Sequence, residues 1–216
     1  MAKRPVFSPS EEPPFVQVED AEFEFFPGFS AKQKHRTVGS LHAAHLAEKP
    51  EAAILEISSK SPSPLGAALS PFNLTISYEG RTSSVEAAFQ GSKRFEGGGP
   101  YTDLLGVPAR VAKRDPRLQE SGELVGYEYL ETEFPVFPRT YFYNWLYATA
   151  LSQHPELAGP LLDYTAFTDI EFNPARSTNC QARAAATFVG LSRAGLLNEA
   201  LESPESFLTV VYPGAQ

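Results

Sequence analysis

The sequence predicts an α+β fold, with a single mainly helical domain that carries a small β-sheet. Several segments have the composition and apolar spacing of helices, whereas only a few short segments look like strands. The chain has 216 residues, of which 42% are hydrophobic, so it can bury one core but is too short for two comfortable domains. We therefore expect residues 51–216 to form one compact unit, and residues 1–50 to form an N-terminal extension packed on its core.

The first part of the chain alternates loops with short elements. The prolines within residues 1–14 indicate a loose arm, and residues 40–47 are typical of a short helix that ends at Lys49-Pro50. Two segments are strand candidates because they are apolar or alternate with period two. They are residues 52–58 and 73–78, the second closed by a Glu79-Gly80 turn, with a proline-rich loop over 61–66 between them.

The remainder of the chain is predominantly helical. Ser83 or Ser84 can cap a helix over residues 85–95, which the glycine run that follows it would end. Three further helices are expected over residues 141–153, 155–162 and 181–201. Because few strands stand among several helices, an α+β arrangement is favoured.

The composition excludes several classes of protein. The basic residues at the N-terminus are followed by Pro5 and a polar segment, and no window approaches 18 consecutive apolar residues, so we expect no secretory signal, no membrane span and a cytoplasmic location. The single cysteine, Cys180, cannot form an internal disulfide. His42 and His45 lie three residues apart without a third ligand nearby, so we expect neither a metal nor another cofactor.

The net charge of −8 bears on nucleic-acid binding. Proteins that hold DNA or RNA nonspecifically usually display an excess of lysine and arginine, which displaces counterions from the phosphates. A chain of this charge that acts on DNA should therefore recognise one modified nucleotide rather than hold a long stretch of backbone.

The predicted helix over residues 85–95 carries a row of polar side chains. Glu86, Gln90 and Lys93 are four and then three residues apart, so on a helix all three project from one face. The row would place an acid, an amide and an amine together at the edge of the core. An ordinary solvated helix face has the same pattern, and the spacing alone does not decide between the two.

Two later segments could approach an anionic ligand. The run Gly97-Gly98-Gly99 leaves backbone amides unshielded, as a pyrophosphate site needs, although a flexible turn has the same composition. Asp169, Glu171 and Phe172 precede the last predicted helix, whose N-terminus would favour an anion. Arg183 on that helix could hold a phosphate through two hydrogen bonds, but simple helix capping explains the polar lead-in equally well.

Residues 54–95 resemble the N-terminal signature of the NADAR (YbiA-like) superfamily. That signature has a Leu/Phe-Ser-x-Phe element, a strand, a glycine turn and then a helix of the form Ser-x-Glu-x-x-Phe-Gln-x-x-Lys-Phe. The corresponding residues are Leu69-Ser70-Pro71-Phe72, Gly80, Ser84, Glu86, Phe89, Gln90 and Lys93, with Phe95 displaced by one because Arg94 intervenes. A second, looser block of the family is similar to residues 168–193, through Asp169, Phe172, Asn179 and Arg193.

Two departures from the YbiA-like pattern narrow the resemblance. Where those members carry Trp-Gly-Asp-Gly, this chain has Phe172-Asn173-Pro174-Ala175, so a carboxylate role moves to Asp169 or Glu171. The stretch EGGGPYTD over residues 96–103 and the aromatic N-terminal extension instead resemble the branch associated with DarT-type toxins. Members of that branch reverse the ADP-ribosylation of guanosine in DNA.

The resemblance implies an ADP-ribosyl glycohydrolase, an N-glycosidase that removes ADP-ribose from guanine bases in DNA and acts as antitoxin to a DarT-type DNA ADP-ribosyltransferase. Its substrate would be ADP-ribosylated guanosine in DNA, and the toxin is a candidate partner. Lys93 is the implied nucleophile, with Glu86 and Asp169 or Glu171 sharing proton transfer. The substrate-binding candidates are Gln90, Gly97, Gly98, Gly99, Tyr101, Asp103, Phe172, Asn179, Gln181 and Arg183.

Two alternatives keep the fold and change the function. YbiA-like members hydrolyse the N-glycosidic bond of an early riboflavin-pathway intermediate, but the missing Trp-Gly-Asp-Gly element argues against that substrate. A non-catalytic ADP-ribose-binding module would need no primary amine beside carboxylates, so Lys93 argues against it. A direct contact between the acidic chain and a basic toxin is compatible with the charge, but the sequence shows no identifiable interface.

Overall fold

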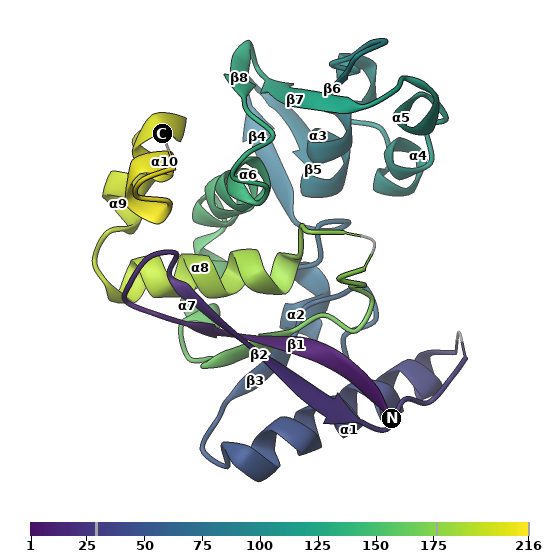
Figure 1. The fold of residues 1–216 in the computed structure, drawn as a ribbon, viewed down its shortest axis with the longest axis vertical. Helices are drawn as coiled ribbons and strands as arrows, with labels where there is room; N and C mark the ends of the chain where they lie inside the picture. The colour runs from purple at the N-terminus through teal and green to yellow at the C-terminus, as the bar shows by residue number, and fades with distance from the viewer. Residues whose placement is uncertain (29, 176, 216) are drawn as a thin grey trace.

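The computed structural model describes residues 1–28, 30–175 and 177–215. It confirms the α+β class, although within these residues the strands divide among three small sheets rather than one (Figure 1). The largest sheet has four strands in the order β2, β1, β9, β3, where β1 runs antiparallel to both neighbours and β3 runs parallel to β9. These strands are β1 (Ala2–Pro9), β2 (Val16–Phe23), β3 (Ile54–Glu56) and β9 (Ala166–Thr168).

The prediction of a loose arm over residues 1–14 is wrong, because β1 is an inner strand of the four-stranded sheet. Proline has no N–H to give to a sheet ladder, so it is tolerated where one side of a strand is largely unpaired. β1 pairs along its length with β2 but meets β9 only at Phe7, which leaves most of that side free of ladder hydrogen bonds. Its side chains alternate between the faces of the sheet: Val6 packs with Val38 and Leu41 of α1, and Phe7 joins the main core. The first residues are thus part of the structural frame.

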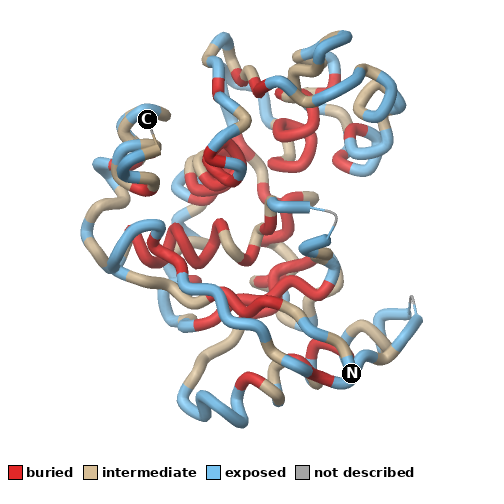
Figure 2. The backbone as a smooth tube through the Cα atoms, viewed as in Figure 1, coloured by how far each residue is buried: buried red, intermediate tan, exposed pale blue. Residues whose placement is uncertain are grey.

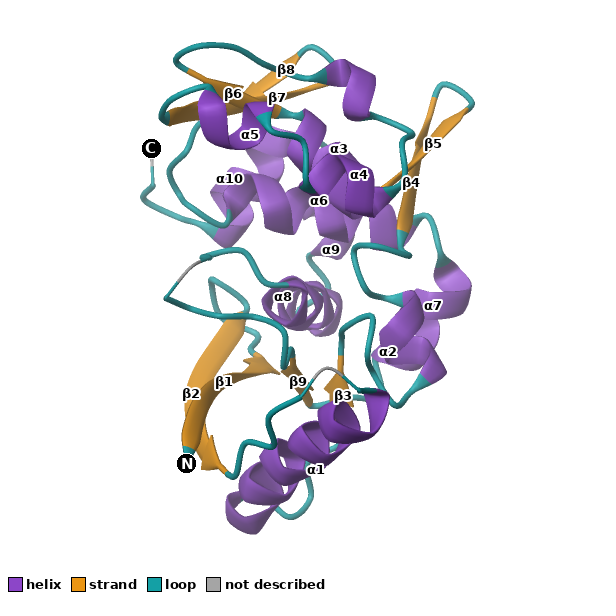
Figure 3. Ribbon diagram, turned by 90° about the vertical axis from the view of Figure 1, so that its right-hand side faces the viewer, coloured by secondary structure: helices purple, strands orange, loops and turns teal. Residues whose placement is uncertain are grey.

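Two helices cover the opposite faces of this sheet, as Figure 3 shows. They are α1 (Ala31–Glu48), much longer than the predicted 40–47 helix, and α8 (Gln181–Arg193). The predicted 181–201 helix is interrupted at Gly195, whose φ of 72° no helix contains, and α9 (Leu197–Ala200) follows. Gly190 of α8 allows the close approach, because a Cβ there would lie 2.3 Å from the carbonyl oxygen of Phe15.

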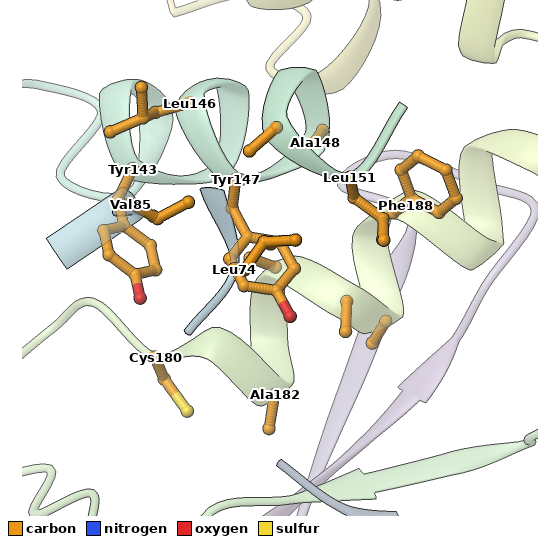
Figure 4. Close-up of a cluster of buried hydrophobic side chains, with 14 of the residues drawn as sticks. Leu74, Val85, Tyr143, Leu146, Tyr147, Ala148, Leu151, Cys180, Ala182 and Phe188 are labelled. Atoms are coloured by element: carbon orange, nitrogen blue, oxygen red, sulfur yellow. The ribbon is translucent and has the colours of Figure 1, made fainter. Parts of the chain in front are cut away.

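The rest of the chain is built on α6 (Tyr141–Ser152), which packs against α8 and confirms the predicted 141–153 helix. Figure 4 shows Tyr143 and Tyr147 pointing from α6 toward Cys180 and Ala182 at the start of α8. The Tyr147 hydroxyl donates a hydrogen bond to the backbone oxygen of Leu69, at 2.8 Å. In Figure 2 the buried residues concentrate along α6, α8, α3 and the middle of the large sheet, which marks the core.

The helix predicted over residues 85–95 is correct only as far as Gly91. There α3 (Val85–Gly91) ends, because the carbonyl of Gly91 accepts the N–H of Tyr101 and the N–H of Phe95 goes to Gly98. Residues 93–95 instead form β6 (Lys93–Phe95), which pairs with β7 (Leu124–Tyr129), and β7 pairs with β8 (Thr132–Phe134). Ser84 caps α3 by accepting the N–H of Ala87, at 3.1 Å.

The predicted strand over 73–78 is present as β4 (Thr75–Tyr78), which forms a hairpin with β5 (Arg81–Ser84). Glu79 and Gly80 both have positive φ, as a two-residue hairpin turn requires. The loop expected over 61–66 is partly helical, because Pro64 begins α2 at a position where helices accept proline. The remaining helices are α2 (Pro64–Ala68), the 3-10 turn η1 (Thr102–Leu104), α4 (Ala109–Lys113), α5 (Arg117–Glu120), α7 (Pro155–Leu161) and α10 (Pro204–Val211). Within the described residues, no helix combines the length and apolarity that crossing a bilayer requires.

Candidate active site

A cavity of about 490 Å³ lies where the end of β9 faces α3 and α4. Parallel β3 and β9 finish side by side, so residues at their carboxyl ends reach the same edge of the sheet. The N-terminal extension closes the cavity with Arg4, Phe25 and Lys34. Its other lining side chains include Ser59, Phe72, Glu86, Lys113, Asp169, Glu171, Phe172, Asn179 and Gln181.

Glu86 presents a buried carboxylate to this cavity from the first turn of α3. It is only 5% exposed. Its Oε1 accepts a hydrogen bond from Gln90 Nε2 at 2.9 Å and lies 3.4 Å from Nζ of Lys113. The predicted pairing of Glu86 with Gln90 on one helix face is therefore confirmed, and Lys113 of α4 adds a cation that the sequence did not single out.

Lys93 lies within the electrostatic influence of Glu86, but it stands on β6 rather than on α3 and forms no ion pair with that carboxylate. Its Nζ is 5.0 Å from the centre of the Phe89 ring, and the side chain does not line the cavity itself. Burial lowers the pKa of Lys93 to about 8, while the Glu86 carboxylate raises it and the charge of Lys113 lowers it. At about pH 7.5 roughly a quarter of such amines are neutral, against roughly 0.1% for an ordinary lysine.

Asp169 follows β9 directly and faces the cavity with a carboxyl that is 5% exposed. Its Oδ1 accepts the backbone N–H groups of Glu171 and Phe172, at 3.0 and 3.2 Å. Burial raises the pKa of Asp169 well above its usual range, and the negative charge of Glu56 raises it further. The carboxyl therefore keeps its proton at a pH where an exposed aspartate has lost it.

Glu56, at the end of β3, is a second buried carboxyl beside Asp169. It accepts hydrogen bonds from Thr168 Oγ1 at 2.7 Å and from the N–H of Ile170 at 2.9 Å. Burial raises its pKa, and the hydrogen bonds oppose that rise. His42 Nε2 lies 2.9 Å from the same Thr168 hydroxyl, and burial followed by the charge of His45 lowers the pKa of His42 to about 4. His42 therefore serves this network as a neutral side chain.

Other predicted residues lie on the rim of the cavity. Glu171 is exposed, and its carboxylate lies 3.4 Å from Nζ of Lys34. Phe172 is half-buried against Phe7, with ring centres 6.4 Å apart. Gln181 lines the wall while its Nε2 donates to the Ile57 carbonyl, at 3.0 Å.

Two predicted binding residues hold buried oxygens without a partner. Within the described part of the chain, neither Gln90 Oε1 nor Asn179 Oδ1 accepts a hydrogen bond, although both are shielded from solvent. Buried acceptors are normally satisfied. Asn179 lines the cavity, so its oxygen is available to an N–H or O–H group of a ligand there, whereas Gln90 lies behind the wall and is not among the lining residues. Arg183 points elsewhere: its guanidinium lies 5.4 Å from the Phe7 ring, and it does not line the cavity.

The glycine run and its neighbours lie outside the cavity. The N–H of Gly97 donates to Ser121 and that of Gly98 to Phe95, so these two amides are not free for a pyrophosphate. A Cβ at Gly99 would lie 2.2 Å from the Lys93 carbonyl oxygen, so the run serves to fold the chain back against β6. Tyr101 and Asp103 both contact Arg117, the tyrosine through its ring and the aspartate through an ion pair of 2.7 Å.

A family model described as the DarT1-associated NADAR antitoxin matches residues 2–216. The chain belongs to this family. A search of curated proteins found no match. The family assignment confirms the NADAR resemblance and its toxin-associated branch, and it gives the protein an antitoxin role opposite a DarT-type toxin.

The match of this NADAR antitoxin begins at residue 2, so it includes the strand β1, which lies outside the two blocks of residues 54–95 and 168–193. Sequence reasoning missed several side chains of the site, among them Glu56, Thr168, Lys113 and Arg4. Glu56 had a visible signal, because it is the only charged residue in the apolar strand candidate over 52–58. Lys113 had none, since α4 is a five-residue helix on the surface.

Proposed function

We propose that this NADAR antitoxin is an ADP-ribosyl glycohydrolase that removes ADP-ribose from guanine bases in DNA. The observation that carries the proposal is the amine of Lys93, whose pKa is lowered to about 8, within the electrostatic influence of the buried Glu86 carboxylate. A second buried carboxyl, Asp169, faces the cavity that Glu86 lines. Simple binding of ADP-ribose needs no amine with a lowered pKa beside two buried acids, whereas cleavage through an imine needs all three.

The reaction begins at the ribose carbon C1″, which carries both the ring oxygen and the guanine amine. Opening of the ring breaks the C1″–O4″ bond, and O4″ takes a proton to become a hydroxyl. The neutral amine of Lys93 then adds to C1″, and guanine leaves with its amine protonated by a neighbouring acid. Water hydrolyses the resulting lysine imine, which releases free ADP-ribose and restores the amine.

Glu86 and Asp169 suit different proton transfers in this scheme. Burial raises the pKa of Asp169, which favours its protonated form, so it is the acid suited to donate to O4″ or to the departing guanine amine. Glu86 lies within the electrostatic reach of Lys93 and can accept the proton that the lysine loses on adding to C1″. A carboxylate at this position also stabilises the positive charge that builds on the sugar.

The binding candidates divide between the two ends of the substrate. Asn179 Oδ1, on the cavity wall, offers an unpaired acceptor for guanine or ribose donors, and Gln90 holds the Glu86 carboxylate in place from behind the wall. The Nε of Arg4 is also buried without a partner within the described residues, and it lines the cavity. A guanidinium in this position suits the pyrophosphate of ADP-ribose. Phe172 on the rim can stack on a base.

The experiment is release of ADP-ribose from a guanine-ADP-ribosylated oligonucleotide by the wild type, Lys93→Ala and Lys93→Arg. Wild-type release, lost in both variants, supports the lysine role, and reduction with borohydride during turnover should trap ADP-ribose covalently on the wild type alone. Lys32→Ala is the matched control, because Lys32 is exposed on α1 and should be dispensable. Absence of release by well-folded wild type would overturn the proposal, and release that survives Lys93→Ala would remove the imine step.

A further inference from the structure

A second cavity, of about 530 Å³, adjoins the candidate active site. Its walls come from α4, the loop after β3 and the Phe72 region. It shares four lining residues with the first cavity: Ser59, Phe72, Lys113 and Glu171. A ligand too long for the active-site cavity can therefore continue into this α4 cleft without leaving the protein surface.

The α4 cleft collects positive charge on a chain whose net charge is −8. Four cations line it: Lys60, Arg110, Lys113 and Arg114. Among the described residues, only Lys113 of these four has an ion-pair partner, Glu86. Of the residues that the structure describes, Glu171 alone is an acid in the cleft wall, and it already lies 3.4 Å from Lys34. The cleft therefore presents more positive charge than its own acid can neutralise.

The geometry of the short helix orients this charge. Arg110 and Arg114 are four residues apart at the start and just beyond the end of α4, so they project from one side at a separation on the order of 6 Å. Phe72 lies between the two cavities, with its ring 4.9 Å from Nζ of Lys113. An aromatic ring flanked by cations is the combination that holds single-stranded nucleic acid, through base stacking and phosphate contacts.

We infer that the α4 cleft binds the DNA strand that flanks the modified guanosine, with Lys60, Arg110 and Arg114 contacting its phosphates. The inference rests on the proposed function, since it takes the active-site cavity to hold the ADP-ribosylated base. It also agrees with the acidic composition, because a few cations in one cleft recognise a short segment of backbone rather than a long duplex. The pyrophosphate of ADP-ribose is a separate anion, and Arg4 in the first cavity is placed to receive it.

The test compares two substrates that carry the same modification: ADP-ribosylated guanosine as the nucleoside, and the same base within a single-stranded oligonucleotide. The wild type should cleave the oligonucleotide with the higher kcat/KM, and this preference should fall as salt rises. In Arg110→Ala/Arg114→Ala, kcat/KM should fall about tenfold or more on the oligonucleotide and stay within about twofold on the nucleoside. Each lost phosphate contact should reduce the logarithmic salt slope by about 0.7.

The matched control is Arg139→Ala, because Arg139 is exposed and lines neither cavity. Equal losses on both substrates would overturn the inference and assign the arginines to ADP-ribose itself. Unchanged activity on both would also overturn it. Thermal melts confirm that each variant is folded.

If the wild type cleaves neither substrate, the proposed function fails, and the cleft is then tested by binding alone. Fluorescence anisotropy with an unmodified single-stranded oligonucleotide should show binding by the wild type and Arg139→Ala that weakens about tenfold in the double variant. The same affinity in all three proteins, or no binding by the wild type, would refute the cleft as a DNA site.

Discussion

The pH dependence of cleavage should follow the titration of Lys93. Its pKa falls from 10.5 to about 8, which at about 1.36 kcal/mol per tenfold change in acidity makes protonation roughly 3 kcal/mol less favourable than in solvent. Since only the neutral amine attacks C1″, kcat/KM should rise about tenfold per pH unit below about 8 and level off above it. Initial rates of ADP-ribose release from the modified nucleoside, which avoids the salt effects of DNA, measure this profile.

Substitution of Glu86 tests whether the inflection belongs to Lys93. The Glu86 carboxylate favours the ammonium form, so Glu86→Gln should move the inflection below about 8 while it also lowers the plateau by removing the proton acceptor. Glu120→Gln, at an exposed position on α5, should leave both unchanged. An inflection near the ordinary lysine value of about 10.4, or an upward shift in Glu86→Gln, would refute the reasoning.

Three further predictions concern single side chains. Asp169→Asn should abolish cleavage yet raise the melting temperature at neutral pH. An acid whose pKa is higher in the folded than in the unfolded protein lowers folding stability as the pH climbs above its unfolded pKa, and asparagine removes that cost. Thermal melts should therefore show the variant's gain in melting temperature vanish near about pH 4. Phe172→Ala should raise KM about tenfold with little change in kcat, as steady-state rates would show. Gly190→Ala should cost about 2 kcal/mol in urea unfolding, because its Cβ would meet the Phe15 carbonyl, and unchanged stability would contradict that contact.

The sequence located the parts of the site that local rules determine. The Ser84 cap, the start of α3 and the pairing of Glu86 with Gln90 all follow from residues within one turn of each other. The position of Lys93 does not follow from such local rules, because the end of α3 depends on a hydrogen bond from the N–H of Tyr101, ten residues beyond Gly91. A helical pattern in the sequence cannot reveal that the chain later turns back and donates a hydrogen bond to the carbonyl at the end of the helix.

The buried carboxyl pair shows the same limit over a longer range. Asp169 could be singled out through the family resemblance, but its neighbour Glu56 binds Thr168 across 112 positions of sequence. Only the parallel pairing of β3 with β9 brings the two together. The prolines of residues 1–14 led to the wrong prediction of a loose arm. Proline preferences describe an isolated segment, whereas β1 is held in the sheet by its pairing with β2.

The buried carboxyls of Glu56 and Asp169 lower the folding stability of the protein at neutral pH. Burial raises the pKa of both acids, and the charge of Glu56 raises that of Asp169 further, so each costs folding free energy at neutral pH that apolar residues would not. The protein limits that cost by giving Glu56 donors from Thr168 and the Ile170 amide, and Asp169 the amides of Glu171 and Phe172. An arrangement that needs four hydrogen bonds to hold two unfavourable groups at the edge of a cavity is explained by chemistry at that cavity rather than by packing.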